Sequence, residues 1–127
     1  MKRYWIGVAA ALGMLLSGGS VSAHHSATGY DLKTSVLKGT LTQVIWANPH
    51  VRVFLDVPEE GGKVTHWVFE GYPPTWFRKV GIRGNDFQKG IGTIVSVTTN
   101  VARDGRTVGF FQGIRFADGS SLLWKFQ

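Results

Sequence analysis

The stretch that decides the fold is Val44-Ile45-Trp46-Ala47-Asn48-Pro49-His50-Val51-Arg52-Val53. Apolar, strand-forming residues stand at both ends of it, and Asn48-Pro49 interrupts them. Proline fixes its own φ angle and disfavours helical geometry in the residue before it, so the chain turns a corner here. We therefore expect one strand to end before the corner and another to begin after it, with His50 at the corner.

The residues after the corner alternate with a period of two, which is typical of a strand with one buried face. The apolar set is Val51, Val53, Leu55 and Val57. His50 and Arg52 then point away from the core. We expect this strand over residues 50–57, a turn over 58–62 and a returning strand over 63–70.

The register of this hairpin follows from which side chains must share the core. The inward residues of the second strand must lie on the same face as Trp67 and Phe69, so only every second register is possible. A turn over residues 58–62 then places His50 opposite Glu70 and Trp67 inward, opposite Val53. On the outer face the same register predicts these pairs: Arg52 with Val68, and Phe54 with His66.

The remaining elements complete a mainly β domain over residues 35–127. We expect strands over 36–46, 93–99, 107–116 and 121–126, a short helix over 73–81, a loop over 85–90, and a bulge or sharp bend at Gly39. Three strands, a helix and further strands are the element order of an OB-fold-like, five- to six-stranded, partly open barrel. A β-sandwich of similar size is the alternative, and the helix between the third and fourth strands argues against it.

Residues 1–23 have the composition of a secretory signal peptide. Lys2 and Arg3 precede an apolar run over residues 5–16, and small residues end the segment at Ala23. The apolar run is shorter than the roughly 20 residues of a membrane-spanning helix. We therefore expect a periplasmic or secreted protein that begins at His24, has no transmembrane anchor after processing and carries an extended arm over residues 24–34.

The composition narrows the classes of partner. Two of the 14 basic residues lie in the predicted signal peptide, so 12 remain against 8 acidic residues. These basic residues are scattered along the chain, which argues against nucleic acid as a partner. The chain has no cysteine, so its stability must come from an apolar core and not from disulfides.

Several short motifs spread over the chain point to one family. They are Ala23-His24-His25-Ser26, Leu37-Lys38-Gly39-Thr40, Trp46-Ala47-Asn48-Pro49-His50, Trp67-Val68-Phe69-Glu70, Gly81, Lys89-Gly90 and Arg103-Asp104-Gly105. In these motifs the chain resembles the DUF6152 proteins, small exported bacterial proteins of unknown function. In the helix it departs from them, with Tyr72-Pro73-Pro74-Thr75-Trp76-Phe77. The resemblance implies export and a small β fold, and it implies no established activity.

The histidines suggest a metal site. Cleavage before His24 would give this residue a free amine, and the amine and imidazole nitrogens together suit Cu(II). His25, His50 or His66 could supply a further nitrogen, with Glu70 orienting the imidazole of His50. Processing after Ser22 would instead leave an Ala-His-His terminus, which also chelates copper. The plainer interpretation, which we favour, is that the terminal histidines are solvated and that His50 and Glu70 form a structural pair.

A ligand-binding face is the second functional hypothesis. OB-like barrels bind extended ligands across their second and third strands, where this chain offers Arg52, Phe54, His66, Val68 and Glu70. An unknown small molecule, a peptide, a saccharide or a small anion would suit an exported protein. A second carboxylate beside Glu70 and a serine nucleophile elbow are both missing, so an enzyme is the least supported class. We expect a non-enzymatic binding protein, with periplasmic copper binding as the alternative.

The signal-peptide interpretation makes a direct prediction. When the full chain is expressed in a bacterium with a periplasm, the exported form should begin at His24 because Val21 and Ala23 satisfy the small-residue cleavage rule. Mass spectrometry of the periplasmic fraction will identify the terminus. A chain that keeps Met1 in the cytoplasm would contradict the prediction, and a chain that begins at Ala23 would shift the cleavage site by one residue.

Overall fold

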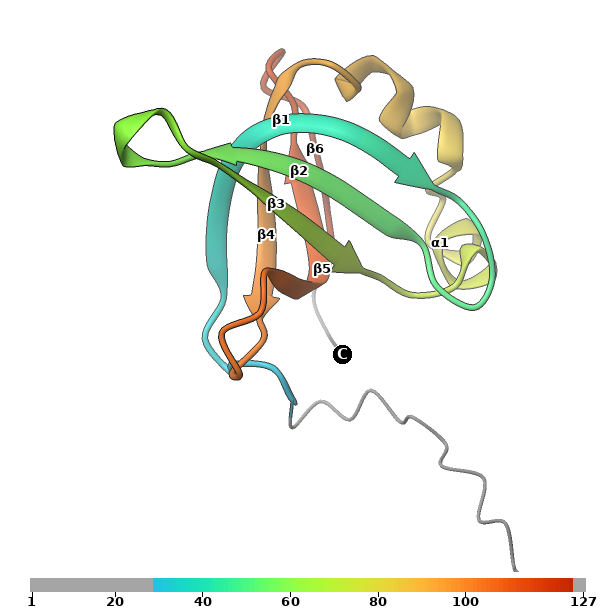
Figure 1. The fold of residues 1–127 in the computed structure, drawn as a ribbon. Coiled ribbons are helices and arrows are strands. Elements are labelled where there is room, and N and C mark those ends of the chain that lie inside the picture. The colour runs from blue at the N-terminus through green and yellow to red at the C-terminus, as the bar shows by residue number, and fades with distance from the viewer. Residues whose placement is uncertain (1–28, 125–127) are drawn as a thin grey trace, which may run out of the picture.

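Strand β1 (Ser35–Ile45) is the longest element among residues 29–124, which the computed structural model describes. Its first half pairs with β4 (Ile94–Val101) and its second half with β2 (Arg52–Pro58), both antiparallel. Figure 1 shows how strongly β1 curves as it passes from one neighbour to the other. One strand therefore belongs to both halves of the sheet.

The other elements follow the corner at Pro49, whose peptide bond with Asn48 is cis. They are η2 (Glu60–Gly62), β3 (Val64–Glu70), α1 (Pro74–Lys79), η3 (Gly84–Gly90), β5 (Val108–Arg115) and β6 (Ser121–Leu123). As expected, α1 begins with a proline in its first turn, and Gly81 after it has a φ of 82°. None of the helices in this part of the chain is long and apolar enough to cross a membrane.

The sheet closes on itself. Its strand order is β3-β2-β1-β4-β5-β6, and a further parallel pairing joins β3 to β5. Five strands thus form a closed barrel, and β6 extends the sheet beyond β5. This is the predicted OB-fold-like architecture, with α1 and η3 inserted between β3 and β4 (Figure 1).

The interior of the barrel is filled by side chains from every strand of the closed sheet and from both helical segments after β3. The fully buried large apolar residues are Leu41, Val51, Val53, Leu55, Phe69, Phe77, Phe87, Val95, Val97, Phe111 and Ile114. Phe77 comes from α1 and Phe87 from η3, so these segments seal the interior. Trp67 packs against this core as predicted, with its ring stacked on that of Phe69 at 5.9 Å between centroids.

The predicted register of the β2–β3 hairpin is wrong by two residues. Pro58 pairs with Val64, so Glu70 lies opposite Arg52 and not opposite His50. Trp67 accordingly lies opposite Leu55, Val53 lies opposite Phe69, and on the outer face Phe54 lies opposite Val68 and Asp56 opposite His66. The parity holds, so every inward residue stays inward.

The turn explains this shift. The positive φ angles that the turn requires fall at Gly61 and Gly62, and the N–H of Glu59 donates to the carbonyl of Lys63 at 2.7 Å. Pro58 therefore remains the last residue of the strand, where its missing N–H costs nothing. The loop spans residues 59–63, one position later than expected.

Two further expectations need correction. The bulge of β1 lies at Thr42, between the pairs that Leu41 and Gln43 form, and not at Gly39. The predicted loop over 85–90 is the 3₁₀ helix η3, in which the Asp86 carboxylate accepts the N–H of Arg83 at 2.7 Å and Phe87 is buried. A 3₁₀ helix of seven residues has no apolar period long enough to recognise in the sequence.

The end of the predicted arm lies against the barrel. Tyr30 forms a β-bridge with Ala102, the N–H of Asp31 donates to the carbonyl of Val101 at 2.8 Å, and the N–H of Arg103 donates to the carbonyl of Gly29 at 3.0 Å. The signal peptide and the double-histidine start, residues 1–25, lie outside the described residues.

The close approach of β1 to β2 predicts the effect of a small substitution. Gly39 is buried, and a Cβ there would overlap the carbonyl oxygen of Asp56 and lie 3.1 Å from the Cα of Val57. Because backbone atoms cannot move aside as a side chain can, Gly39→Ala should destabilise the fold by about 3 kcal/mol. Gly29→Ala, where a Cβ meets no atom within 4 Å, is the matched control. Urea unfolding will measure both, and equal midpoints would contradict the close contact.

Candidate functional site

The outer surface of β2, β3 and β5 carries a mixed apolar and charged patch, which we call the outer face. The β2–β3 ladder pairs Arg52 with Glu70 and Phe54 with Val68. The parallel β3–β5 ladder then adds Phe110 beside Glu70, and Val108 beside Val68. Arg52 is exposed and the others are half-buried. Three strands thus present one continuous surface.

Aromatic rings border the outer face at the end of β3. Tyr72 stacks on Trp76 of α1 at 4.2 Å between centroids and meets Phe110 edge-on at 5.3 Å. Tyr30, from the docked arm, also meets Phe110 edge-on, at 6.1 Å between centroids. Half-buried rings from four segments therefore lie beside the charged pair that Arg52 of β2 and Glu70 of β3 form.

The two tyrosine hydroxyls remain protonated at neutral pH. Burial raises the pKa of Tyr30, and the Glu70 carboxylate raises it further, while Arg106 acts in the opposite direction. Burial alone raises the pKa of Tyr72. Each hydroxyl can both donate and accept a hydrogen bond. The border of the outer face is thus neutral and polar.

The structure separates the histidines that the sequence suggested as partners. The Nδ1 atom of His50 lies 3.1 Å from the carbonyl oxygen of Gly71. Arg52 occupies the position opposite Glu70 that the sequence predicts for His50. His66 lies at the far end of the β2–β3 ladder, is 78% exposed and has its Nδ1 atom 2.6 Å from the Asp56 carboxylate. The predicted ligand residues Arg52, Phe54 and Glu70 do share the outer face, and His66 lies one pair beyond it.

Residues 29–124 contain no group of three or more histidine and acidic side chains that could hold a metal ion. His24 and His25 lie outside the described residues, so the copper hypothesis stays a prediction from the sequence. In the β2–β3 register the residue opposite Glu70 is Arg52 and not His50.

Sequence analysis missed Tyr30, Tyr72 and Phe110. Phe110 follows Gly109 in a strand that alternates in burial, so its outward direction was predictable, but its neighbour was not. Only the parallel β3–β5 pairing brings it beside Glu70. Tyr30 and Tyr72 lie in irregular segments, where a sequence pattern does not indicate the direction of a side chain.

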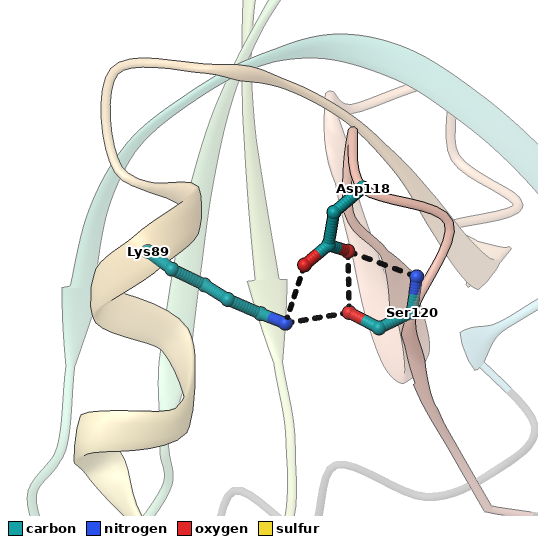
Figure 2. A network of polar contacts seen from close by, with 3 residues as sticks. All are labelled: Lys89, Asp118 and Ser120. Carbon is teal, nitrogen blue, oxygen red and sulfur yellow. Dashed lines mark hydrogen bonds and ion pairs between the residues drawn. The ribbon is translucent and has the colours of Figure 1, made fainter.

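A polar cluster lies apart from the outer face and joins η3 to the turn between β5 and β6 (Figure 2). The ammonium of Lys89 donates to the Asp118 carboxylate at 3.0 Å and to the Ser120 hydroxyl at 2.5 Å. The hydroxyl and backbone N–H of Ser120 both donate to the same carboxylate, at 2.6 and 2.9 Å. The ammonium of Lys89 also lies 4.6 Å from the ring centroid of Phe116. Every polar group of the cluster is thus bonded within it, which makes it a structural tie.

The comparison with protein families agrees with the resemblance seen in the sequence. The model of DUF6152, described as a family of unknown function, matches residues 13–112. The chain belongs to this family. No curated protein matches it, and no solved structure does either. Membership in DUF6152 brings no activity with it, so the function has to be argued from the barrel itself.

The Lys89 cluster makes a prediction about titration. The hydrogen bonds from Ser120, and then that from Lys89, lower the pKa of Asp118 from 3.8 to about 2. Because the folded state holds the carboxylate ionised, Asp118 favours folding above pH 4, and this contribution is lost as the pH falls toward 2. In NMR titrations, Ser120→Ala should raise the pKa of Asp118 more than Lys89→Met does.

Asp104 supplies the control for this titration. Hydrogen bonds from Arg106 lower its pKa, and it belongs to a different turn. Its titration should therefore be the same in both variants. If neither variant moved the titration midpoint of Asp118, the cluster would not exist in solution.

Proposed function

We propose that this protein is an exported, non-enzymatic binding module and that it takes an extended saccharide across the outer face. The observation that supports the proposal is the joint placement of Arg52, Phe54, Glu70 and Phe110 on three adjacent strands. Rings pack against the apolar faces of sugars, and charged side chains beside them exchange hydrogen bonds with hydroxyl groups.

The closed sheet favours a saccharide over a peptide on this face. A peptide that adds to a sheet needs a free strand edge, where main-chain groups lack partners. At the positions that form the outer face, each of β2, β3 and β5 pairs with a strand on both sides, so this face has no such edge. Recognition there must use side chains, and half-buried rings with neutral hydroxyls at the border suit sugar rings.

Export is part of the proposal and rests on the predicted signal peptide. An exported protein meets the polysaccharides of the cell envelope and of the surroundings, whereas nucleic acid is rare there. The absence of cysteine fits such a module because a closed barrel with an aromatic core needs no disulfide.

The outer face can be tested with neutral oligosaccharides. We expect cellohexaose, chitohexaose or maltohexaose to shift the backbone NMR signals of β2, β3 and β5 in the processed protein. Phe54→Ala should weaken that binding about tenfold because the variant loses a stacking ring. The free energy of unfolding should fall by less than for a fully buried phenylalanine, since Phe54 is only half-buried on the outside of the barrel.

Ile94→Ala is the matched control for Phe54→Ala. Ile94 is a 56% exposed apolar residue at the start of β4, away from the outer face. Its removal should leave the affinity unchanged. If none of the three hexasaccharides shifted signals on the outer face, or if both variants lost affinity equally, the proposal would be wrong. Shifts with an extended hexapeptide alone would make the face a peptide site.

A further inference from the structure

A hollow lies where η3 meets the end of β1, separate from the outer face. It has a volume of about 310 Å³, near the lower limit for small-molecule sites. Its lining residues are Val44, Trp46, Arg83, Gly84, Asn85 and Gln88. Two apolar side chains, one from β1 and one from the residue after it, thus form one wall. Three polar side chains from η3 and the residue before it form the other.

The apolar wall is held in place by its neighbours. The ring of Trp46 contacts Phe77 at 5.4 Å and Phe87 at 5.9 Å between centroids, both at tilted angles. The backbone of Gly84 lies against the same ring, since a Cβ at this position would be only 3.1 Å from the Cγ of Trp46. The half-buried indole therefore has a fixed orientation beside the hollow.

The polar wall follows from 3₁₀ geometry. In a helix with three residues per turn, side chains three positions apart lie above one another. Asn85 and Gln88 therefore form one row, which lines the hollow, while Asp86 and Lys89 form another. The second row is used by the fold, because Asp86 accepts the N–H of Arg83 and Lys89 ties η3 to Asp118 (Figure 2).

The polar groups of the hollow have unused hydrogen-bonding capacity. Within residues 29–124, the Arg83 guanidinium makes no ion pair, and the side-chain amides of Asn85 and Gln88 make no hydrogen bond. All three side chains are exposed to solvent. A guanidinium binds a carboxylate with two parallel N–H donors, and an amide can both donate to and accept from a hydroxyl.

We propose that this hollow binds a uronic acid, either free or as one unit of an acidic polysaccharide. The carboxylate would pair with Arg83, the apolar face of the sugar ring would pack on Trp46, and the hydroxyls would meet Asn85 and Gln88. One sugar ring fits the volume, and a single cation beside neutral amides suits a single carboxylate. This site differs from the outer face in location and in charge.

Titration of the ¹⁵N-labelled, processed protein with sodium glucuronate tests the proposal. The side-chain amide signals of Asn85 and Gln88 and the indole N–H signal of Trp46 should shift and saturate. Glucose, which lacks the carboxylate, and acetate, which lacks the ring, should each bind at least tenfold more weakly. Equal binding of glucose would overturn the role of Arg83, and equal binding of acetate would reduce the hollow to a general anion site.

Two arginine variants complete the test. Arg83→Gln should lower the affinity for glucuronate about tenfold, to the level of glucose. Arg78→Gln, which removes an exposed arginine of α1 that does not line the hollow, should leave it unchanged. Equal affinity in both variants would overturn the proposal. The hexasaccharide experiment follows backbone signals of β2, β3 and β5, and the glucuronate experiment follows side-chain signals around the hollow. Either proposal can therefore fail without the other.

Discussion

The parallel pairing of β3 with β5 is the constraint on which the rest of the structure depends. It closes the five-stranded barrel through Val68, Phe69 and Glu70 of β3 and residues 108–110 of β5. Gly109 makes this approach possible, because a Cβ there would strike the Thr99 hydroxyl and lie 3.1 Å from the ring of Phe69. The same hydroxyl donates to the carbonyl of Phe110 at 2.9 Å. Closure therefore leaves no open edge on β3 over residues 68–70, where β5 pairs with it.

The outer face exists because of this closure. β2 and β3 alone would present Arg52, Phe54, Val68 and Glu70, which is a narrow strip at the edge of a sheet. β5 adds two more apolar side chains, Val108 and Phe110, and the ring of Phe110 contacts those of Tyr30 and Tyr72. A surface suited to an extended ligand thus results from packing between distant parts of the chain.

The end of the barrel is organised by a different set of contacts. Phe77 and Phe87 fill the opening from α1 and η3, and Trp46 lies against both. The Lys89 cluster then ties η3 to the turn after β5, which holds the helix from its other side. With the interior sealed in this way, Arg83, Asn85 and Gln88 are left at the surface around a small hollow. The fold therefore separates its two candidate binding surfaces, one on the strands and one at the barrel end.

The sequence by itself determined the strands, the helix α1 and the inward side of the β2–β3 hairpin, because these depend on local periodicity and on residues such as Pro74 and Gly81. It also indicated Arg52, Phe54 and Glu70 as one surface, since side chains alternate along a strand. Only the tertiary structure decided that Arg52, and not His50, lies opposite Glu70, because the positive φ angles of Gly61 and Gly62 set the turn. Likewise, the neighbours of Phe110, Tyr30 and Arg83 come from segments far apart in the chain, and local periodicity carries no information about such contacts.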